Sequence, residues 1–303
     1  MSTEQAPGEQ KTGVAAAVAA YVMWGLLPLY LIALRGTSAE QVLIHRILWS
    51  IPFGALIISA RKQWPDVIEA LRTPKVLIPL IGTSLIIGIN WLIYIMAVQG
   101  QQIFEASLGY YINPLIYMLV GVAVLGERLS TMQKVAVVLA AIGVTILTLS
   151  GGKFPVVSLA LGITFTAYGY LRKVTVVGAM PGLFIETLIL APIAAIWLFA
   201  FIPDASRAFG TTTELTILLI AAGPVTVLPL LCFAIGARRL PLSTIGFLQF
   251  IGPTLQFVIG VIDGQPFTLA HQLCFGFIWL AAGVFAFDAL RKARALQPSV
   301  SKA

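Results

Sequence analysis

The sequence has 303 residues, of which 59% are hydrophobic and only 10% are charged. This balance excludes a soluble domain built around a single core, because so apolar a chain has too few polar residues to cover a water-facing surface. The formal net charge of +7 is not a nucleic-acid signature, since the basic residues lie in short loops beside apolar runs, where they report topology. We therefore expect a membrane protein with many spans.

Apolar runs of about 20 residues, the length that crosses a bilayer, alternate with short loops rich in charge, Pro or Gly. Ten such runs are predicted to be transmembrane helices. They cover residues 13–34, 41–60, 76–98, 103–125, 131–149, 154–172, 181–201, 213–236, 241–262 and 267–290. The first run is too long for the apolar core of a signal peptide, and no small-residue cleavage site follows it, so we expect it to be retained.

The distribution of basic residues sets the orientation of these helices. If the helices alternate in direction, the side opposite the N-terminus carries only Arg35, Lys153 and Arg207, and Arg46 falls within a span. The rest of the 19 lysines and arginines fall on the N-terminal side. Because cytoplasmic loops carry the excess of Lys and Arg, both termini are predicted to lie in the cytoplasm.

Two adjacent ionisable residues, His45 and Arg46, interrupt the second predicted helix. They lie about 7 Å from its outer end at a rise of 1.5 Å per residue. A cation there carries part of the cost of about 2.5 to 3.5 kcal/mol found near the bilayer centre. Because ionisable residues within spans usually face the bundle interior, we expect this pair to line an aqueous or substrate-facing cavity. The alternative is that Arg46 snorkels to the headgroups.

An internal repeat relates the two halves of the chain. The segment LGYYINPLIYMLVGVAVLGE (108–127) resembles GFLQFIGPTLQFVIGVIDGQ (246–265), and this alignment matches Pro114 with Pro253. Five spans per copy is an odd number, so the second copy must enter the membrane upside down relative to the first. Secondary transporters are commonly built from such inverted repeats, with their sites near the midplane.

The repeat predicts four segments along the chain. A polar N-terminal tail over 1–12 precedes a first five-helix repeat over 13–150, and an inverted five-helix repeat over 151–290 precedes a basic cytoplasmic tail over 291–303. The fold class expected is thus an all-α integral membrane protein with ten transmembrane helices.

Proline occurs at matched positions in the two repeats. Pro114, after Asn113, and Pro253 each lie ten to twelve residues into a predicted span. Proline lacks an N–H and clashes with the carbonyl four residues back, so Tyr110 and Gln249 are predicted to lose helical partners. Matched interruptions point to a transporter's binding site. The alternative is a structural kink packed against neighbouring helices.

Aromatic and amide side chains near these interruptions are the candidates for a substrate cavity. They are Trp24, Asn90, Tyr94, Tyr110, Asn113, Pro114, Tyr168, Gln249, Pro253 and Gln256. Such a lining suits amphipathic organic solutes, because it offers stacking surface and a few directional hydrogen bonds. For each aromatic residue, core packing or an interfacial position is the alternative.

Candidates for gating or ion coupling are the ionisable residues within or beside the spans: His45, Arg46, Glu105 and Glu186. An outer contact of His45 or Arg46 with Glu105 is predicted. Glu186 is expected near the inner end, within reach of Arg238 or Arg239. Charge pairs that open and close alternately would support alternating access, and His45 or Glu186 could carry protons. The alternative is that these pairs only fix helix positions.

Several segments together carry a family resemblance. They are YVMWGLLPLY, EQVLIHRILWS, NWLIYIMAV, EASLGYYINPL, LGERLS, RRLPLSTIGFLQFIGPTLQF and FIWLAAGVFAFDAL. The combination resembles the RarD group of EamA-type transporters, in the drug/metabolite transporter superfamily. The resemblance implies ten helices in two inverted repeats, movement of small metabolites or drugs across the bacterial inner membrane, and an association with chloramphenicol sensitivity. One departure is Gln265, beside Asp263, where the resemblance leads us to expect a Glu.

An intramembrane enzyme and a passive channel are the alternative functions. The sequence has no G-x-S-x-G, H-E-x-x-H or P-loop motif, and no Cys/His cluster with metal-ligand spacing. We therefore expect a carrier that is not an enzyme and has no cofactor or metal. Its expected partners are a small-molecule substrate, the lipid bilayer and protons, with no nucleic acid. A monomer is expected because ten helices can enclose a cavity within one chain.

Overall fold

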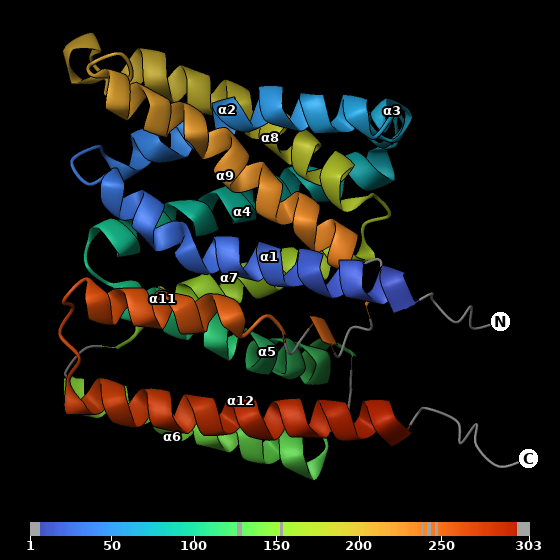
Figure 1. The fold of residues 1–303 in the computed structure, drawn as a ribbon, viewed down its shortest axis with the longest axis vertical. Helices are drawn as coiled ribbons and strands as arrows, with labels where there is room; N and C mark the ends of the chain where they lie inside the picture. Colours follow the sequence, from blue (N-terminus) through green and yellow to red (C-terminus); the bar gives the residue numbers. More distant parts are fainter. Residues whose placement is uncertain are drawn as a thin grey trace, which may run out of the picture.

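The structure, a computed structural model, is a bundle of helices (Figure 1). It describes residues 7–125, 129–151, 154–237, 239–240, 244–245 and 248–295. These residues contain no β-strand, and seven of their helices are long and apolar enough to cross a membrane. The all-α fold predicted from composition is thus confirmed. Arg238, the side chain of Tyr117 and the ends of both predicted tails lie outside the described residues.

The helices follow the predicted spans closely, with a few differences at their ends. They are α1 (Pro7–Ala33), α2 (Ala39–Ala60), α3 (Trp64–Arg72), α4 (Pro74–Gln99), α5 (Ile103–Leu125), α6 (Thr131–Gly151), α7 (Val156–Val174), α8 (Ala179–Ile196), α9 (Thr213–Ala237), α11 (Ile251–Ile262) and α12 (Leu269–Ala295), with a π-helical turn η1 (Trp197–Phe201) and a 3-10 turn η2 (Asp204–Ser206) between α8 and α9. Helices α1 and α12 extend into the predicted tails, because the polar residues there are mostly good helix formers.

The segment between the second and third predicted spans forms the short helix α3, which the hydropathy pattern did not predict. Pro65 in its first turn favours the helix start. The helix buries Val67 and exposes Trp64 and Ile68. An amphipathic helix with exposed apolar side chains beside a membrane bundle is typical of an element that lies in the lipid–water interface.

The ninth predicted span, 241–262, differs from the structure. Helix α11 begins only at Ile251, and Gln249 and Phe250 form a turn before it. The predicted span is therefore interrupted near its middle, as expected, but the turn precedes Pro253, which is the third residue of α11. Proline is tolerated in a first turn because the N–H groups there have no intrahelical partner. Pro114, by contrast, lies inside α5 as predicted.

The bundle has two distinguishable ends. Helix α1 begins and α12 ends at the same end, where α3 also lies (Figure 1). We call this the terminal end and the opposite one the distal end. The short connections from α1 to α2 and from α4 to α5 cross the distal end, because short connections join antiparallel neighbours.

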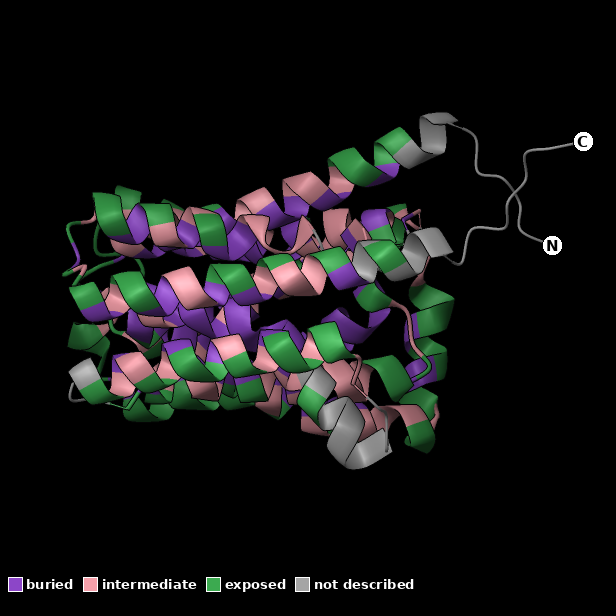
Figure 2. Cartoon of the chain, turned by 90° about the horizontal axis from the view of Figure 1, so that it is seen from below, coloured by how far each residue is buried: buried purple, intermediate pink, exposed green. Residues whose placement is uncertain are grey.

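Helices from the two halves of the sequence pack against each other throughout the bundle. Helix α1 packs against α9 and α11, and α7 packs against α4 and α5. Helix α2 contacts α8 and α9, α5 contacts α11, and α6 pairs with α12. Buried positions gather on the inward faces of these helices and exposed ones on the outside (Figure 2). The interior is therefore built jointly by both halves.

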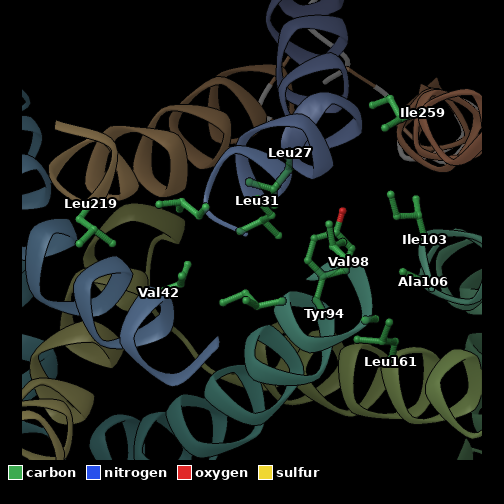
Figure 3. Close-up of a cluster of buried hydrophobic side chains, with 13 residues drawn as sticks. Leu27, Leu31, Val42, Tyr94, Val98, Ile103, Ala106, Leu161, Leu219 and Ile259 are labelled. Atoms are coloured by element: carbon green, nitrogen blue, oxygen red, sulfur yellow. The ribbon is translucent and has the colours of Figure 1, made fainter. Parts of the chain in front are cut away.

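A cluster of buried apolar side chains fills the distal half of the bundle (Figure 3). Its members are Leu27, Leu31, Leu34, Val42, Tyr94, Ile95, Ala97, Val98, Ile103, Ala106, Leu161, Leu219 and Ile259. They come from α1, α2, α4, α5, α7, α9 and α11 or the residues beside them, and most lie near the distal ends of these helices. We call this the distal cluster. Close packing of apolar side chains excludes water from this end.

The close approach of α2 to α9 depends on Gly223. A Cβ added there would lie against the carbonyl oxygen of Trp49 and the ring of Phe53. We expect Gly223→Leu to destabilise the protein by about 1–3 kcal/mol, as overpacking does, and to lower the apparent melting temperature in detergent. Gly82→Leu is the control, because nothing lies within 4 Å of a Cβ built at Gly82. Equal melting temperatures for the two variants would contradict this packing.

Candidate functional site

Arg46 lies inside the bundle, about 10 Å along α2 from the helix start. It is 7% exposed, so the alternative that it snorkels to the headgroups was wrong. Its guanidinium carbon lies 4.3 Å from the ring centre of Trp91 on α4. Its Nε donates a 2.8 Å hydrogen bond to Oγ1 of Thr226 on α9. Tyr94 lies one helical turn further along α4 than Trp91.

A row of aromatic rings leads from this arginine toward α8. The rings of Tyr94 on α4 and Tyr110 on α5 lie 5.7 Å apart, centre to centre. Tyr110 meets Phe165 on α7 edge to face, also at 5.7 Å, and Phe165 lies 6.3 Å from Tyr168. We call these four rings the aromatic row. It brings together three residues predicted for the cavity, namely Tyr94, Tyr110 and Tyr168.

Glu186 on α8 lies at the other end of the aromatic row and is fully buried. Its Oε1 accepts a 2.6 Å hydrogen bond from the Thr83 hydroxyl, and its Oε2 accepts one of 3.1 Å from the Tyr168 hydroxyl. The Nε of Arg172, in the last turn of α7, lies 3.7 Å from Oε1. Helices α4, α7 and α8 therefore enclose a carboxyl group with a cation beside it.

Among the described residues, the cation beside Glu186 is Arg172 and not the expected Arg239. Arg239 donates to the carbonyl of Ile235, one turn back in its own segment, and Arg238 lies outside the described residues. Arg172 takes the place of these residues because α7 packs between α4 and α5 and points its last turn toward the start of α8. Sequence reasoning counted Arg172 only as a topology signal in a loop.

Polar contacts between the two halves join the helix ends at the distal end. Arg35 donates from Nη1 at 2.9 Å and from Nη2 at 2.6 Å to the two carboxyl oxygens of Asp263. The side-chain oxygen of Gln265 accepts the N–H of Ile103 at 2.8 Å, and its Nε2 donates to Asp263 at 3.3 Å. A Gln at this position thus fits beside Asp263 without placing two carboxylates together.

Two further contacts join the halves at the same end. Gln41 donates to the carbonyl of Ser206 at 3.0 Å and accepts the N–H of Ala208 at 2.7 Å. The Nε2 of His271 lies 3.7 Å from an oxygen of Glu105. We call the Arg35–Asp263, Gln265–Ile103, Gln41 and Glu105–His271 contacts the distal contacts.

Acid is expected to loosen the distal contacts only below the usual range of growth pH. Hydrogen bonds from Arg35 hold the pKa of Asp263 below its ordinary value of 3.8. A group with a lowered pKa stabilises the paired state at pH above its ordinary value, and this contribution is lost as pH falls through the lowered pKa.

This pH dependence is measurable by the labelling rate of a cysteine placed at Ala106, which is fully buried in the distal cluster. In a variant lacking Cys232 and Cys274, we expect slow labelling by a membrane-impermeant maleimide from about pH 8 to about pH 5, with each rate divided by that of the same cysteine in denatured protein at that pH, because only the thiolate reacts. Arg35→Gln should raise the rate throughout this range. If the labelling rate of the protein that retains Arg35 and Asp263 rises as the pH falls through this range, the prediction is contradicted.

The expected outer contact of His45 or Arg46 with Glu105 was also wrong. Glu105 contacts His271 instead, and the ring of His45 stacks on Phe209 with ring centres 5.2 Å apart. His45 turns toward the connection before α9, where it lines a shallow pocket with Leu48, Trp49, Pro52 and Phe209. Neither of its ring nitrogens has a hydrogen-bond partner among the described residues.

Asn90 and Asn113 lie at contacts with α7. Asn90 donates to the carbonyl of Leu161 at 3.1 Å and to Oγ1 of Thr164 at 2.9 Å, so its amide joins α4 to α7. Asn113 is buried on α5 beside Gly162, and its oxygen has no partner in the described part of the chain. Pro114, the next residue, is buried with it.

The remaining candidates lie between α1, α9 and α11. Trp24 packs against Phe233 with ring centres 5.7 Å apart, and Gln256 donates to its carbonyl at 3.2 Å. The carbonyl of Pro253 accepts a 2.8 Å hydrogen bond from Ser107. Gln249 is half-buried in the turn before α11. The structure therefore separates this group from the aromatic row.

Sequence reasoning missed several members of the site, namely Thr83, Trp91, Phe165, Arg172 and Thr226. Trp91 carried a usable signal, because it lies three residues before Tyr94 and so shares its helical face. The hydroxyls of Thr83 and Thr226 stand alone within apolar runs and carried none.

A bundle of apolar helices with a buried cation, an aromatic row and an enclosed carboxyl group in its interior defines a membrane protein of the transporter class. Residues 11–149 match the EamA-like transporter family. An uncharacterized transporter of Vibrio cholerae is 44% identical over 290 residues, which cover 95% of this chain and 96% of that protein. Protein RarD of Escherichia coli is 41% identical over 284 residues, covering 93% and 96%. The chain belongs to the RarD group of EamA-type transporters and is a bacterial membrane protein.

Two further likenesses are more distant. A Pseudomonas aeruginosa protein named chloramphenicol-sensitive protein RarD is 32% identical over 287 residues, covering 93% of this chain and 96% of that protein. A crystal structure of a protein with 19% sequence identity superposes with a TM-score of 0.62 and covers 93% of this chain and 98% of that one. The latter shows that the two chains share a fold.

Proposed function

We propose that the chain is a secondary transporter that moves small amphipathic metabolites or drugs by alternating access. The observation that carries this proposal is the buried series of side chains from Arg46 along the aromatic row to Glu186, enclosed by helices of both halves, which we call the interior path. Such a path offers stacking surface and a few directional donors to an organic solute. An intramembrane enzyme and a passive channel are the alternatives, and the filled distal end favours a carrier over an open pore.

The proposal includes ten transmembrane helices in two inverted repeats, over 13–150 and 151–290, with α3 outside the count. The packing pattern supports this. In the two proposed repeats, α1 corresponds to α7, α4 to α9 and α5 to α11. The α1–α9 contact then corresponds to the contact of α7 with α4, and the α1–α11 contact to that of α7 with α5. All four contacts are present. The α2–α8, α5–α11 and α6–α12 contacts map onto themselves. Repeats related by an axis in the membrane plane have such a pattern.

The terminal end is proposed to face the cytoplasm of the bacterial inner membrane. The basic residues Arg61, Lys62, Arg72 and Lys75 flank α3 at that end, as the distribution of Lys and Arg in cytoplasmic loops requires. The distal end then faces outward, and the structure represents a state closed to the outside. One chain encloses the whole path, so the proposed working unit is a monomer in the lipid bilayer.

Two features of the substrate and the driving force follow as proposals. One relative bears the name chloramphenicol-sensitive, and chloramphenicol is an amphipathic aromatic solute, so it belongs in the first panel of test compounds. Glu186 is the proposed proton carrier, because it is an enclosed carboxyl group at the end of the aromatic row. Protonation would change its attraction to Arg172.

Uptake into proteoliposomes tests the proposal. Labelled chloramphenicol and aromatic amino acids would be supplied with and without a pH gradient, and with unlabelled solute preloaded inside. A carrier gives saturable uptake that preloading accelerates, whereas a channel gives uptake that preloading does not accelerate. Arg46→Ala should remove the uptake, and Arg207→Ala, in the exposed connection before α9, should keep it. Uptake no greater than in protein-free liposomes for every solute would contradict the proposal.

A further inference from the structure

We propose that Arg46 forms a carboxylate-binding site, so that the solute carried is an amphipathic monocarboxylate. This inference rests on the proposed transport function and adds the chemical class of the substrate. It begins from the charge state of the site. In the described residues, no carboxylate lies within ion-pair distance of Arg46, since every ion pair there involves another cation.

The guanidinium of Arg46 is only partly satisfied by its surroundings. Within the described part of the chain, its one hydrogen bond runs from Nε to Thr226. The Thr226 hydroxyl donates its own proton to the carbonyl of Ala222 at 2.8 Å, so it can only accept from Arg46. Trp91 covers one face of the guanidinium. The terminal nitrogens therefore remain as donors for a ligand, and they form the fork that matches a carboxylate.

A second, independent observation points to an acceptor at the same place. The hydroxyl of Tyr94 is fully buried and has no hydrogen-bond partner among the described residues. Leaving a buried hydroxyl unpaired is costly, and Tyr94 lies one turn along α4 from Trp91, the ring that covers Arg46. A carboxylate bound at Arg46 offers the oxygen that this hydroxyl lacks. One ligand would thus satisfy two groups that the protein leaves unsatisfied.

Charge and shape narrow the ligand further. A single cation at the site balances a monoanion, whereas a phosphate dianion would leave a buried negative charge without a partner. The aromatic row extends from the same point, so the apolar or aromatic body of the solute would lie along Tyr110 and Phe165. Tyr94 belongs to both the site and the distal cluster, and the rest of that cluster lies toward the distal end, because Val42 is one turn before Arg46 on α2. The solute would therefore enter from the terminal end in this state.

Calorimetric binding to the detergent-purified protein tests this site. The probes are 3-phenylpropionate, hexanoate and indole-3-acetate, each beside its uncharged primary amide, with phenyl phosphate as the dianion. At least one carboxylate should bind at least tenfold more tightly than its amide and than phenyl phosphate. Arg46→Gln should weaken the binding of the carboxylate about a hundredfold while changing that of the amide little, because only the carboxylate loses charged hydrogen bonds.

Two further variants keep the test independent of folding. Arg46→Lys retains the charge without the fork and should bind the carboxylate with intermediate affinity. Tyr94→Phe removes one hydroxyl and should weaken the carboxylate about tenfold. Arg207→Gln is the control cation outside the site. Equal binding of acid and amide, an unchanged affinity in Arg46→Gln, or the absence of binding by all three carboxylates would each overturn the inference.

The binding result is separable from transport. Carboxylate binding that depends on Arg46, without any solute uptake, would leave the site standing and contradict the proposed function. Saturable uptake without preference for acids over amides would support the proposed transport function and contradict the carboxylate-binding site.

Discussion

A short bifunctional methanethiosulfonate link between cysteines at positions 35 and 263 is expected to reduce uptake to the level of protein-free liposomes. The two side chains come from opposite halves and meet at 2.6 Å, so the link would hold the distal contacts closed. Alternating access requires those contacts to separate once in every cycle. Uptake would be measured in a variant lacking Cys232 and Cys274, before and after linking.

Reduction of the link with dithiothreitol should restore uptake, which separates a block from misfolding. The matched control links cysteines at 204 and 207, which form an ion pair within one connection and need not separate. Full activity of completely linked 35–263 protein would show that the distal end stays closed during transport and would overturn the proposed cycle.

Glu186→Gln is expected to abolish uptake driven by a pH gradient while leaving exchange of solute between the two sides intact. Glutamine matches the shape of the carboxyl group and keeps an oxygen to accept from Thr83, but it cannot take up or release a proton. Accumulation against a concentration gradient should therefore fall to background, and preloaded liposomes should still exchange label.

Glu214→Gln is the matched control for this prediction, because Glu214 is exposed in the first turn of α9 and belongs neither to the interior path nor to the distal contacts. It should retain accumulation driven by the pH gradient. If Glu186→Gln protein still concentrates solute when only a pH gradient is imposed, another group carries the proton or no proton is carried.

The burial of Arg46 was predictable from sequence, whereas its partners were not. A cation eight residues into an apolar helix is costly at a lipid-facing position, and this cost alone points it inward. Its partner Thr226 lies 180 residues further along the chain. Which face of α9 meets α2 is set by close packing at Gly223, and hydropathy carries no information about that register.

Two errors in the helix assignment have the same kind of cause. The interruption of the run over 241–262 was predicted from Pro253, but its place, a turn at Gln249 and Phe250, was not, because an average over 20 residues cannot locate a helix start inside an apolar run. The same average missed the helix α3, because the apolar side chains of that charged segment cover only one face and its mean hydropathy is therefore low. The predicted pairing of Glu105 failed because it assumed that outer charges meet across neighbouring helices, while His271 comes from α12.

The ion pair of Arg35 with Asp263 lies near the surface, with 31% of the arginine side chain exposed. Attraction between exposed charges is screened by dissolved salt, over a Debye length that falls from about 30 Å at 0.01 M to about 8 Å at 0.15 M. If the distal end faces outward, the electrolyte of the surroundings acts directly on this pair. A cell in fresh water and one in brine would then hold the same protein at different balances between its two facing states, with no change in its sequence or its substrate.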